Sequence, residues 1–383
     1  MLLNRRTLIL GGLSGSTAFV APSSFAQLTK EPRKLVLGQS VPLTGAADQI
    51  GLAYFNGAKM YFDSINEKNG VAGYKIEVKV LDDGYDAVVA ARNAKQFIDS
   101  KVDALFGFVG TASSDAAAAV AKASGVIFFA PFAASDSLHA PDMTHVFHVR
   151  SALADDGYKV VRHCATLNQD RIAVFAEDDA MGRAGLAAVK EALVDLKRPA
   201  ILAHALSPVN SDKVEAAVAT LMKAQPQAII LFSLFNSSAA FIKKMRRAGY
   251  VGQFLTFSVV GIDPLFSALG KDIGGIVVSQ VVPSPRNTGS PIVREYLDVL
   301  NQTDQAPSYE SIEGYIAARA FAQGVQRSTL GNGKPDRSGL QKAFESMTNA
   351  DIGGFRINLR AKKYESVRAI DLVSITSGGK TLR

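Results

Sequence analysis

The alternation of short apolar runs with amphipathic stretches constrains the fold of this chain more than any other feature. The run Ala228–Phe232 contains no polar residue, as in strands buried on both faces of a parallel sheet. Each strand with its following helix occupies about 25 to 35 residues, the length of a βαβ crossover. The chain is therefore predicted to be α/β with parallel sheets. The predicted strands are 35–41, 75–81, 102–106, 126–129, 171–175, 200–205, 228–232 and 254–257.

The series of units breaks near residues 146–150, with similar numbers of units before and after the break. At 383 residues the chain is too long for one ordinary core, so we predict two similar lobes. A further apolar run, 277–282, ends in Pro283-Ser284-Pro285 and predicts a second crossing between the lobes. Repeated crossings form a hinge above a cleft. The expected divisions are 27–150 and 281–347 for the first lobe, and 151–280 and 348–383 for the second.

The first 26 residues have the organisation of a cleavable export signal. Arg5 and Arg6 precede an apolar run over 7–20, and the small residues Ser24 and Ala26 predict cleavage near Ala26. The arginine pair resembles a twin-arginine signal, and an ordinary secretory signal is the alternative. The apolar run is shorter than the roughly 20 residues that span a bilayer. We therefore expect the mature chain to work outside the cytoplasm, without insertion into a membrane.

Composition argues against several classes of protein. The formal net charge of +7 is spread along the chain, and no aromatic residues interleave with the basic ones, so we expect no nucleic-acid partner. Cys164 is the single cysteine, which excludes an intramolecular disulfide, and we expect it to be a buried small apolar residue. The mature chain has no Gly-x-Ser-x-Gly motif, and its five histidines form no metal-ligand pattern. We expect no enzyme, no cofactor and no metal.

Candidate ligand residues lie in the turns after the predicted strands, because open parallel sheets bind ligands beyond the carboxyl ends of their strands. Residues 107–115 follow one strand and offer free backbone N–H groups at a helix start, which can hold an anion. Residues 130–136 follow the next strand, where Pro131 restricts the turn and small residues leave the backbone approachable. For the serine and aspartate residues of both turns, helix capping is the alternative role. In the second half, 176–183, 232–236 and 256–261 occupy the equivalent turns and combine apolar walls with few polar groups, as small-molecule sites do.

Six short motifs follow one another along the chain: Pro42-Leu43-Thr44-Gly45, Phe55-Asn56-Gly57-Ala58, Ile65-Asn66 preceding Val71-Ala72-Gly73, Leu81-Asp82-Asp83, Val109-Gly110-Thr111 and Ala130-Pro131-Phe132. In this order and spacing they resemble the bacterial extracellular solute-binding proteins of ABC transporters, of the branched-chain amino-acid type. The resemblance covers nearly all of 34–376 and implies two Rossmann-like lobes with parallel central sheets, joined by a three-crossing hinge and closing on a ligand without catalysis. This is the type I periplasmic binding protein fold.

The resemblance also implies where the ligand lies, position by position. The first-lobe turns would hold a ligand carboxylate, largely through backbone N–H groups, and the second lobe would cover the ligand's body. The implied ligand residues are Gly110, Thr111, Phe132, Ala133 and Ala134 in the first lobe, Met181, Phe235 and Ser258 in the second, and Gln280 at a crossing.

Two positions depart from the pattern of the family's amino-acid binders. Met181 stands where they have an aromatic residue, and Ser258 stands near the place of the acid that neutralises the ligand ammonium. A buried ammonium without a counter-charge costs several kcal/mol, unless Asp178 or Asp179 supplies one. The departures therefore favour an aromatic or other organic carboxylate over an α-amino acid.

The expected function is that of a periplasmic receptor that binds a small organic acid or amino-acid-like molecule and delivers it to the membrane permease of an ABC importer. We expect a monomer. A true branched-chain amino-acid binder and a ligand-sensing subunit of a signalling receptor are the alternatives. An exported α/β enzyme is the remaining one, with Glu177–Asp179 as its weak acid–base candidates.

Overall fold

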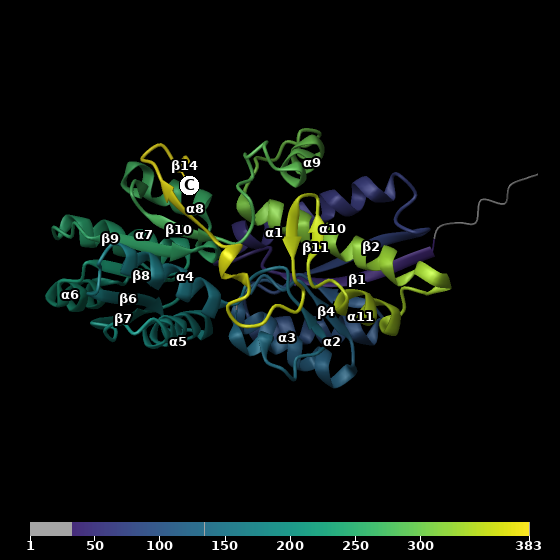
Figure 1. The fold of residues 1–383 in the computed structure, drawn as a ribbon, viewed down its shortest axis with the longest axis horizontal. Coiled ribbons are helices and arrows are strands. Elements are labelled where there is room, and N and C mark those ends of the chain that lie inside the picture. The colour runs from purple at the N-terminus through teal and green to yellow at the C-terminus, as the bar shows by residue number, and fades with distance from the viewer. Residues whose placement is uncertain (1–32, 134, 383) are drawn as a thin grey trace, which may run out of the picture. The chain divides into compact units, whose positions relative to one another are not determined.

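The computed structural model describes residues 33–133 and 135–382, and the first of its two main sheets has five parallel strands in the order β2-β1-β3-β4-β5. The predicted export signal and Ala134 lie outside the described residues. We call this sheet and the helices packed on it the first lobe (Figure 1). Its strands are β1 (Arg33–Val41), β2 (Tyr74–Asp82), β3 (Ala104–Phe106), β4 (Ile127–Phe129) and β5 (Val146–Phe147).

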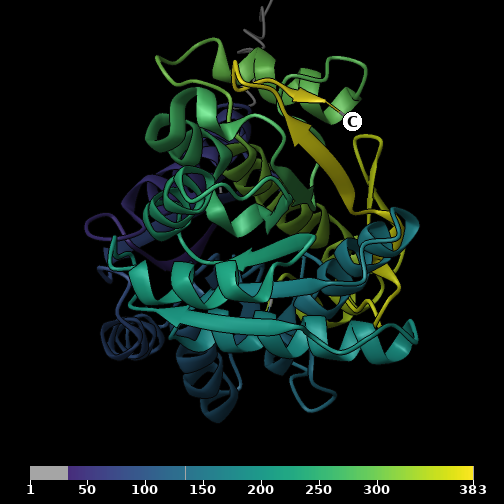
Figure 2. The ribbon, with the colours of Figure 1, turned by 90° about the vertical axis from the view of Figure 1, so that its left-hand side faces the viewer.

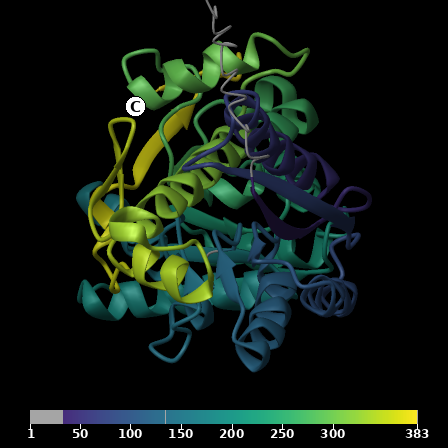
Figure 3. The same ribbon diagram turned by 90° about the vertical axis from the view of Figure 1, so that its right-hand side faces the viewer.

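Helices cover both faces of the first sheet. Phe106 and Phe129 point to the face where α10 runs beside α1, as Figure 3 shows, and Leu105 and Phe128 point to the face covered by α2 and α3. The alternation follows from the strand repeat of two residues, which sends neighbouring side chains to opposite faces. The helices are α1 (Asp48–Asn66), α2 (Ala87–Asp99), α3 (Thr111–Ser124), α10 (Tyr309–Ser328) and α11 (Arg337–Glu345).

The second lobe is built on a seven-stranded sheet in the order β14-β13-β10-β9-β8-β6-β7 (Figure 2). Five of its strands are parallel, namely β6 (Ile172–Glu177), β7 (Ala203–Ser207), β8 (Ala228–Phe232), β9 (Gln253–Phe257) and β10 (Val277–Gln280). The edge strands β13 (Asp371–Ile375) and β14 (Thr381–Leu382) are antiparallel to their neighbours. The helices are α4 (Leu153–Thr166), α5 (Ala180–Asp195), α6 (Glu215–Ala224), α7 (Phe235–Arg247) and α8 (Ile262–Leu269).

The chain passes between the two sheets in three segments, which we call crossings. The first crossing, 148–152, joins β5 to α4, and the second, 281–290, leads from β10 to α9 (Pro291–Leu300). The third, 358–370, leads from the hairpin of β11 (Ala350–Ile352) and β12 (Phe355–Ile357), which contacts α10, back to β13.

The predicted α/β class, with two lobes, parallel central sheets and three crossings, is confirmed. Strand β13 is antiparallel to β10. This strand enters the sheet from the first lobe, so no crossover helix requires it to be parallel. Cys164 is buried, as expected, and within the described residues no helix is long and apolar enough to cross a membrane.

Candidate functional site

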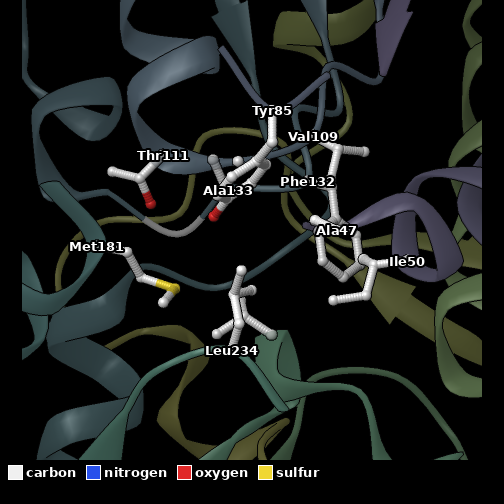
Figure 4. Close-up of a pocket in the computed structure, with 11 residues that line it drawn as sticks. Ala47, Ile50, Tyr85, Val109, Thr111, Phe132, Ala133, Met181 and Leu234 are labelled. Atoms are coloured by element: carbon white, nitrogen blue, oxygen red, sulfur yellow. The ribbon is translucent and has the colours of Figure 1, made fainter. Parts of the chain in front are cut away.

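A cavity lies between the two lobes, at the carboxyl ends of their parallel strands. Its first-lobe wall includes the loops that come after β3 and β4 in the sequence, and its second-lobe wall includes residues that come after β6, β8 and β9. This is the expected place for ligand sites of open α/β sheets. In Figure 4, Thr111 and Met181 face each other across the free space, and Leu234 closes it from the second lobe. The lining residues are Ala47, Ile50, Tyr85, Val109, Gly110, Thr111, Phe132, Ala133, Met181, Leu234 and Val259.

The N-terminus of α3 forms the polar part of the first-lobe wall. Gly110 precedes the helix with a φ of 102°, a conformation that glycine adopts without strain, and its carbonyl accepts the first helical hydrogen bond from Ser114. No side chain of the described residues caps this helix, although both Gly110 and Thr111 line the cavity. The first-turn N–H groups and the hydroxyl of Thr111, which points into the free space in Figure 4, therefore offer hydrogen-bond donors to an anion.

Tyr85 covers this helix start from the loop after β2. A Cβ atom on Gly110 would lie 2.6 Å from Cε2 of Tyr85, so the ring packs directly on the glycine. Burial, followed by the charges of Asp179 and Glu177, raises the pKa of Tyr85 far above its usual value, so its hydroxyl stays protonated. The hydroxyl is an uncharged group at the rim of the cavity.

Phe132 supplies the aromatic wall. Its N–H donates to the carbonyl of Phe108 over 2.8 Å, which holds the loop after β4 against the loop after β3. The edge of its ring meets the ring of Tyr54, with centroids 5.2 Å apart, and the guanidinium carbon of Arg150 lies 4.1 Å from the Phe132 centroid. The ring is therefore clamped between an aromatic neighbour and a buried cation.

The second-lobe wall is apolar. Met181 lies in the first turn of α5, Leu234 directly precedes α7, and Val259 lies in a short 3₁₀ turn after β9. The N-cap residue of α7 is Leu234, whose aliphatic side chain makes no capping hydrogen bond, so this helix start also reaches the cavity.

The three acidic residues that follow β6 are engaged elsewhere. Glu177 accepts hydrogen bonds from the Asn210 N–H over 2.8 Å and the Ser237 hydroxyl over 2.6 Å, and burial raises its pKa to about 6. Asp178 pairs with Arg183 at 2.5 Å, and Asp179 caps α5 by accepting the Gly182 N–H at 2.7 Å. None of the three lines the cavity, and no residue that does carries a formal charge.

The structure brings together most, but not all, of the residues singled out from the sequence. Gly110, Thr111, Phe132, Ala133 and Met181 line the cavity; Ala134 is outside the described residues. Phe235, Ser258 and Gln280 are buried but do not line it.

In the second lobe, two of the expected residues are replaced in the cavity lining by the residue next to them in the sequence. Leu234 lines the cavity beside Phe235, and Val259 lines it beside Ser258, whose hydroxyl accepts a hydrogen bond from Arg150. The side-chain amide of Gln280 is buried with neither its oxygen nor its nitrogen hydrogen-bonded.

Sequence reasoning missed Tyr85, Ala47 and Ile50. Tyr85 lies two residues beyond the Leu81-Asp82-Asp83 motif, so the rule that ligands lie beyond strand ends could have found it. Ala47 and Ile50 lie at the start of α1 and carry no polar group, so no sequence signal pointed to them.

The site can bind but offers little chemistry for catalysis. Its lining residues include no histidine, cysteine, lysine or carboxylate, and the described residues hold no group of three or more potential metal-ligating His, Cys, Asp or Glu side chains. Cys164 is remote from the lining, and burial raises the pKa of its thiol to about 12. The arrangement is a small apolar chamber with hydrogen-bond donors at one end.

Comparison with known proteins agrees with the two-lobed fold. The family model for periplasmic binding proteins matches residues 34–380. The chain is 21% identical to the Leu/Ile/Val-binding protein homolog 3 of Brucella melitensis, over 89% of this chain and 93% of that protein.

Solved structures are similar over almost the whole chain. A possible leucine/isoleucine/valine-binding protein from Rhodopirellula baltica has a TM-score of 0.85 and 27% identity, covering 92% of this chain and 97% of that one. A fatty acid ABC transporter substrate-binding protein from Thermomonospora curvata has a TM-score of 0.82 and 19% identity, covering 92% of each chain. The names of these similar proteins span two chemically different ligands, an α-amino acid and a fatty acid, and both ligands carry a carboxylate.

Proposed function

We propose that this chain, which belongs to the periplasmic binding protein family, is the substrate-binding component of an ABC importer and captures a small apolar carboxylate that has no α-ammonium group. In this proposal it works as a monomer in the periplasm and delivers its ligand to a membrane permease. The observation that carries the proposal is a helix start without a capping side chain, α3, facing a cavity whose lining residues carry no charge.

The ligand carboxylate would lie at the start of α3. Backbone N–H groups and the helix dipole favour a negative charge there, and Thr111 and Ala133 line the same end of the cavity. Charge-assisted hydrogen bonds of this kind are about twice as strong as neutral ones, so a carboxylate needs no arginine or lysine in the lining.

An α-ammonium group would lack a partner in the cavity. The nearest acidic residues in the sequence, Glu177–Asp179, are engaged with their own neighbours, and Ser258 is engaged with Arg150. Burying an ammonium group without a counter-charge costs several kcal/mol. This cost favours an aromatic or branched aliphatic acid over leucine, isoleucine or valine.

The body of the ligand would contact the apolar walls. Phe132 and Ile50 from the first lobe and Met181 and Leu234 from the second enclose the space from both sides, so closing the lobes buries an apolar ligand on every face. A ligand shifts the lobes toward the closed state only by its extra affinity for that state. The pivots of this motion would be the three crossings, 148–152, 281–290 and 358–370, and the β11–β12 hairpin would move with α10, which it contacts.

Titration calorimetry with matched ligand pairs tests the proposal. The protein is freed of bound ligand by unfolding and refolding, then titrated with leucine and with 4-methylpentanoate, which keeps the carbon skeleton and lacks the ammonium group. The pair of phenylalanine and 3-phenylpropanoate extends the test to an aromatic body. We expect each acid lacking the amino group to bind at least about 100-fold more tightly than its amino-acid partner.

Tight leucine binding with no response to either acid would contradict the ligand assignment and favour a branched-chain amino-acid binder. Co-purification with a signalling receptor in place of a permease would contradict the transport role. Chemical conversion of the bound acid would contradict the assignment as a binding protein.

A further inference from the structure

A buried ion pair lies directly behind the aromatic wall of the cavity. Arg150, in the first crossing, donates from Nε to Oε1 of Glu313 over 2.9 Å and from Nη2 to Oε2 over 2.7 Å. Only 1% of the Arg150 side chain and 4% of the Glu313 side chain is exposed. Two parallel charge-assisted hydrogen bonds fix the plane of the guanidinium group, whose central carbon also lies 4.1 Å from the centre of the Phe132 ring.

The same guanidinium group reaches the second lobe. Its Nη1 donates to Oγ of Ser258 over 2.6 Å. Ser258 directly follows β9 and directly precedes Val259, which lines the cavity. One buried cation therefore connects the aromatic wall of the first lobe with the loop that carries a wall residue of the second.

The contacts of Arg150 with Glu313 and Phe132 lie within the first lobe, whereas its contact with Ser258 reaches the second. Glu313 lies on α10, which packs along α1 in the first lobe, and Phe132 lies in the loop after β4 of the same lobe. Of the hydrogen bonds that Arg150 donates, the one to Ser258 crosses between the lobes, and the charge of Arg150 also acts on the buried carboxyl group of Asp156, on α4 of the second lobe. When the lobes separate, the bidentate pair and the contact with the Phe132 ring keep Arg150 with the first lobe, so the Ser258 hydrogen bond is the one that breaks.

We propose that Arg150 is a positioning residue whose hydrogen bond to Ser258 forms in the closed state and holds the lobes together over the ligand, an inference that rests on the proposed function. Arg150 touches Phe132 and not the cavity, and Ser258 acts through Arg150 and not by contact with the ligand. Loss of the hydrogen bond therefore weakens the binding of every ligand by the same factor, since it changes the closed population and not the contacts in the cavity.

The test compares Ser258→Ala with Ser267→Ala. Ser267 is also in the second lobe, but its hydroxyl donates within α8, to the carbonyl of Asp263, so its removal leaves the lobe contact intact. Calorimetry measures the affinity of each variant for 4-methylpentanoate and 3-phenylpropanoate. We expect Ser258→Ala to lose about tenfold in affinity for both acids, the scale of a hydrogen bond to a charged group, and Ser267→Ala to lose nothing.

A second measurement follows the lobes directly. Val88 in the first lobe and Val251 in the second are 78% and 98% exposed, so cysteines at these positions accept a donor and an acceptor dye, whereas the native Cys164 is fully buried. Single-molecule energy transfer then gives the closed fraction with and without ligand. We expect Ser258→Ala to lower the closed fraction at every ligand concentration that populates it.

Arg150→Lys is the second variant. A lysine keeps the charge opposite Glu313 but cannot donate to Glu313 and Ser258 in the same planar geometry, so we expect the same uniform loss of affinity. If the Ser258→Ala variant lost affinity for one acid alone, Ser258 would be in contact with the ligand. If its closed fraction were unchanged, the hydrogen bond between Arg150 and Ser258 would not hold the lobes together. Either result overturns the inference. Failure of every acid to bind contradicts the proposed function instead, and the closed fraction still tests the role of Arg150.

Discussion

The cavity and the buried charged groups behind it, which we call the hinge, are neighbouring regions with opposite chemistry. The residues that line the cavity carry no charge and present backbone N–H groups and apolar side chains. The hinge holds Arg150 with the carboxyl groups of Asp156, Glu310 and Glu313, all almost fully buried. The ring of Phe132 separates the two regions, with one face toward Arg150.

The difference assigns ligand recognition to the cavity and lobe closure to the buried charges in the proposed function. Under the proposed function, recognition of the ligand would depend on backbone donors and shape, which a change of side chain alters only locally. The balance between open and closed lobes would depend on buried charges, whose strength in a low-dielectric surrounding makes them sensitive to any missing partner. Each of the following predictions alters one of the two regions at a time.

The largest effect is expected from breaking the hinge ion pair. Glu313→Ala leaves Arg150 charged and buried without its bidentate partner, so we expect the free energy of unfolding to fall by about 3–5 kcal/mol. Urea denaturation followed by circular dichroism measures it. The matched control is Glu77→Ala, which removes the pair with Lys34 at 3.3 Å, where the two side chains are 48% and 69% exposed. The control should lose less than about 1 kcal/mol; equal losses would mean that burial does not distinguish the hinge pair.

A smaller effect is expected from changing the polar end of the cavity. Gly110→Ala forces a side chain into a backbone with φ of 102° and places a Cβ against the ring of Tyr85. We expect the affinity for the acid ligand to fall about 10- to 100-fold, because strain of this kind costs of order 1–3 kcal/mol.

The control lies at the other end of the same helix. Gly125 also has a positive φ, 62°, but a Cβ there would meet nothing within 4 Å. Gly125→Ala should lower the unfolding free energy and leave the affinity unchanged, as measured by calorimetry. Retained affinity in Gly110→Ala would place the carboxylate away from α3.

The last prediction concerns the pH dependence of the buried carboxyl groups behind the cavity. Burial raises the pKa of Glu310 from 4.5 to about 7, with backbone and Ser308 hydrogen bonds opposing the shift and the nearby Asp263 and Glu313 adding to it. The folded state therefore binds the proton more tightly than the unfolded state does. Stability from this group is present below pH 4.5 and is lost as the pH rises to about 7.

Glu310→Gln removes this titration and keeps the size of the side chain. We expect the variant to gain stability relative to the unaltered protein as the pH rises from 4.5 to 7, with a constant difference above pH 7. Chemical denaturation at several pH values measures the difference. A difference that does not change with pH would mean that Glu310 does not titrate in this range.

Much of the site could be predicted from the sequence because the apolar runs show where the strands end. The loops after β3 and β4 follow apolar runs directly, and parallel strands bring their carboxyl ends to one edge, so Gly110 and Phe132 could be placed near each other. In the second lobe the loops could be predicted, but not which residue of each points inward. Leu234 and Val259 line the cavity where their neighbours Phe235 and Ser258 were expected, because the direction of a side chain in a turn depends on local backbone angles.

The hinge network could not be predicted at all. Arg150 and Glu313 are 163 residues apart, and Arg150 and Ser258 are 108 apart, with no repeat or motif connecting them. In the sequence, nothing distinguishes Glu313 from the other polar residues around it.

The sequence by itself therefore determined the two-lobed α/β architecture and the loops at the edge of each sheet, because hydrophobic periodicity and strand ends are local properties of the chain. Only the tertiary structure decided which side chains enter the cavity. It also decided that the acidic residues after β6 have other partners and that Ser258 accepts a hydrogen bond from Arg150. Those outcomes depend on which distant groups meet in the folded state, and burial makes each such meeting energetically large.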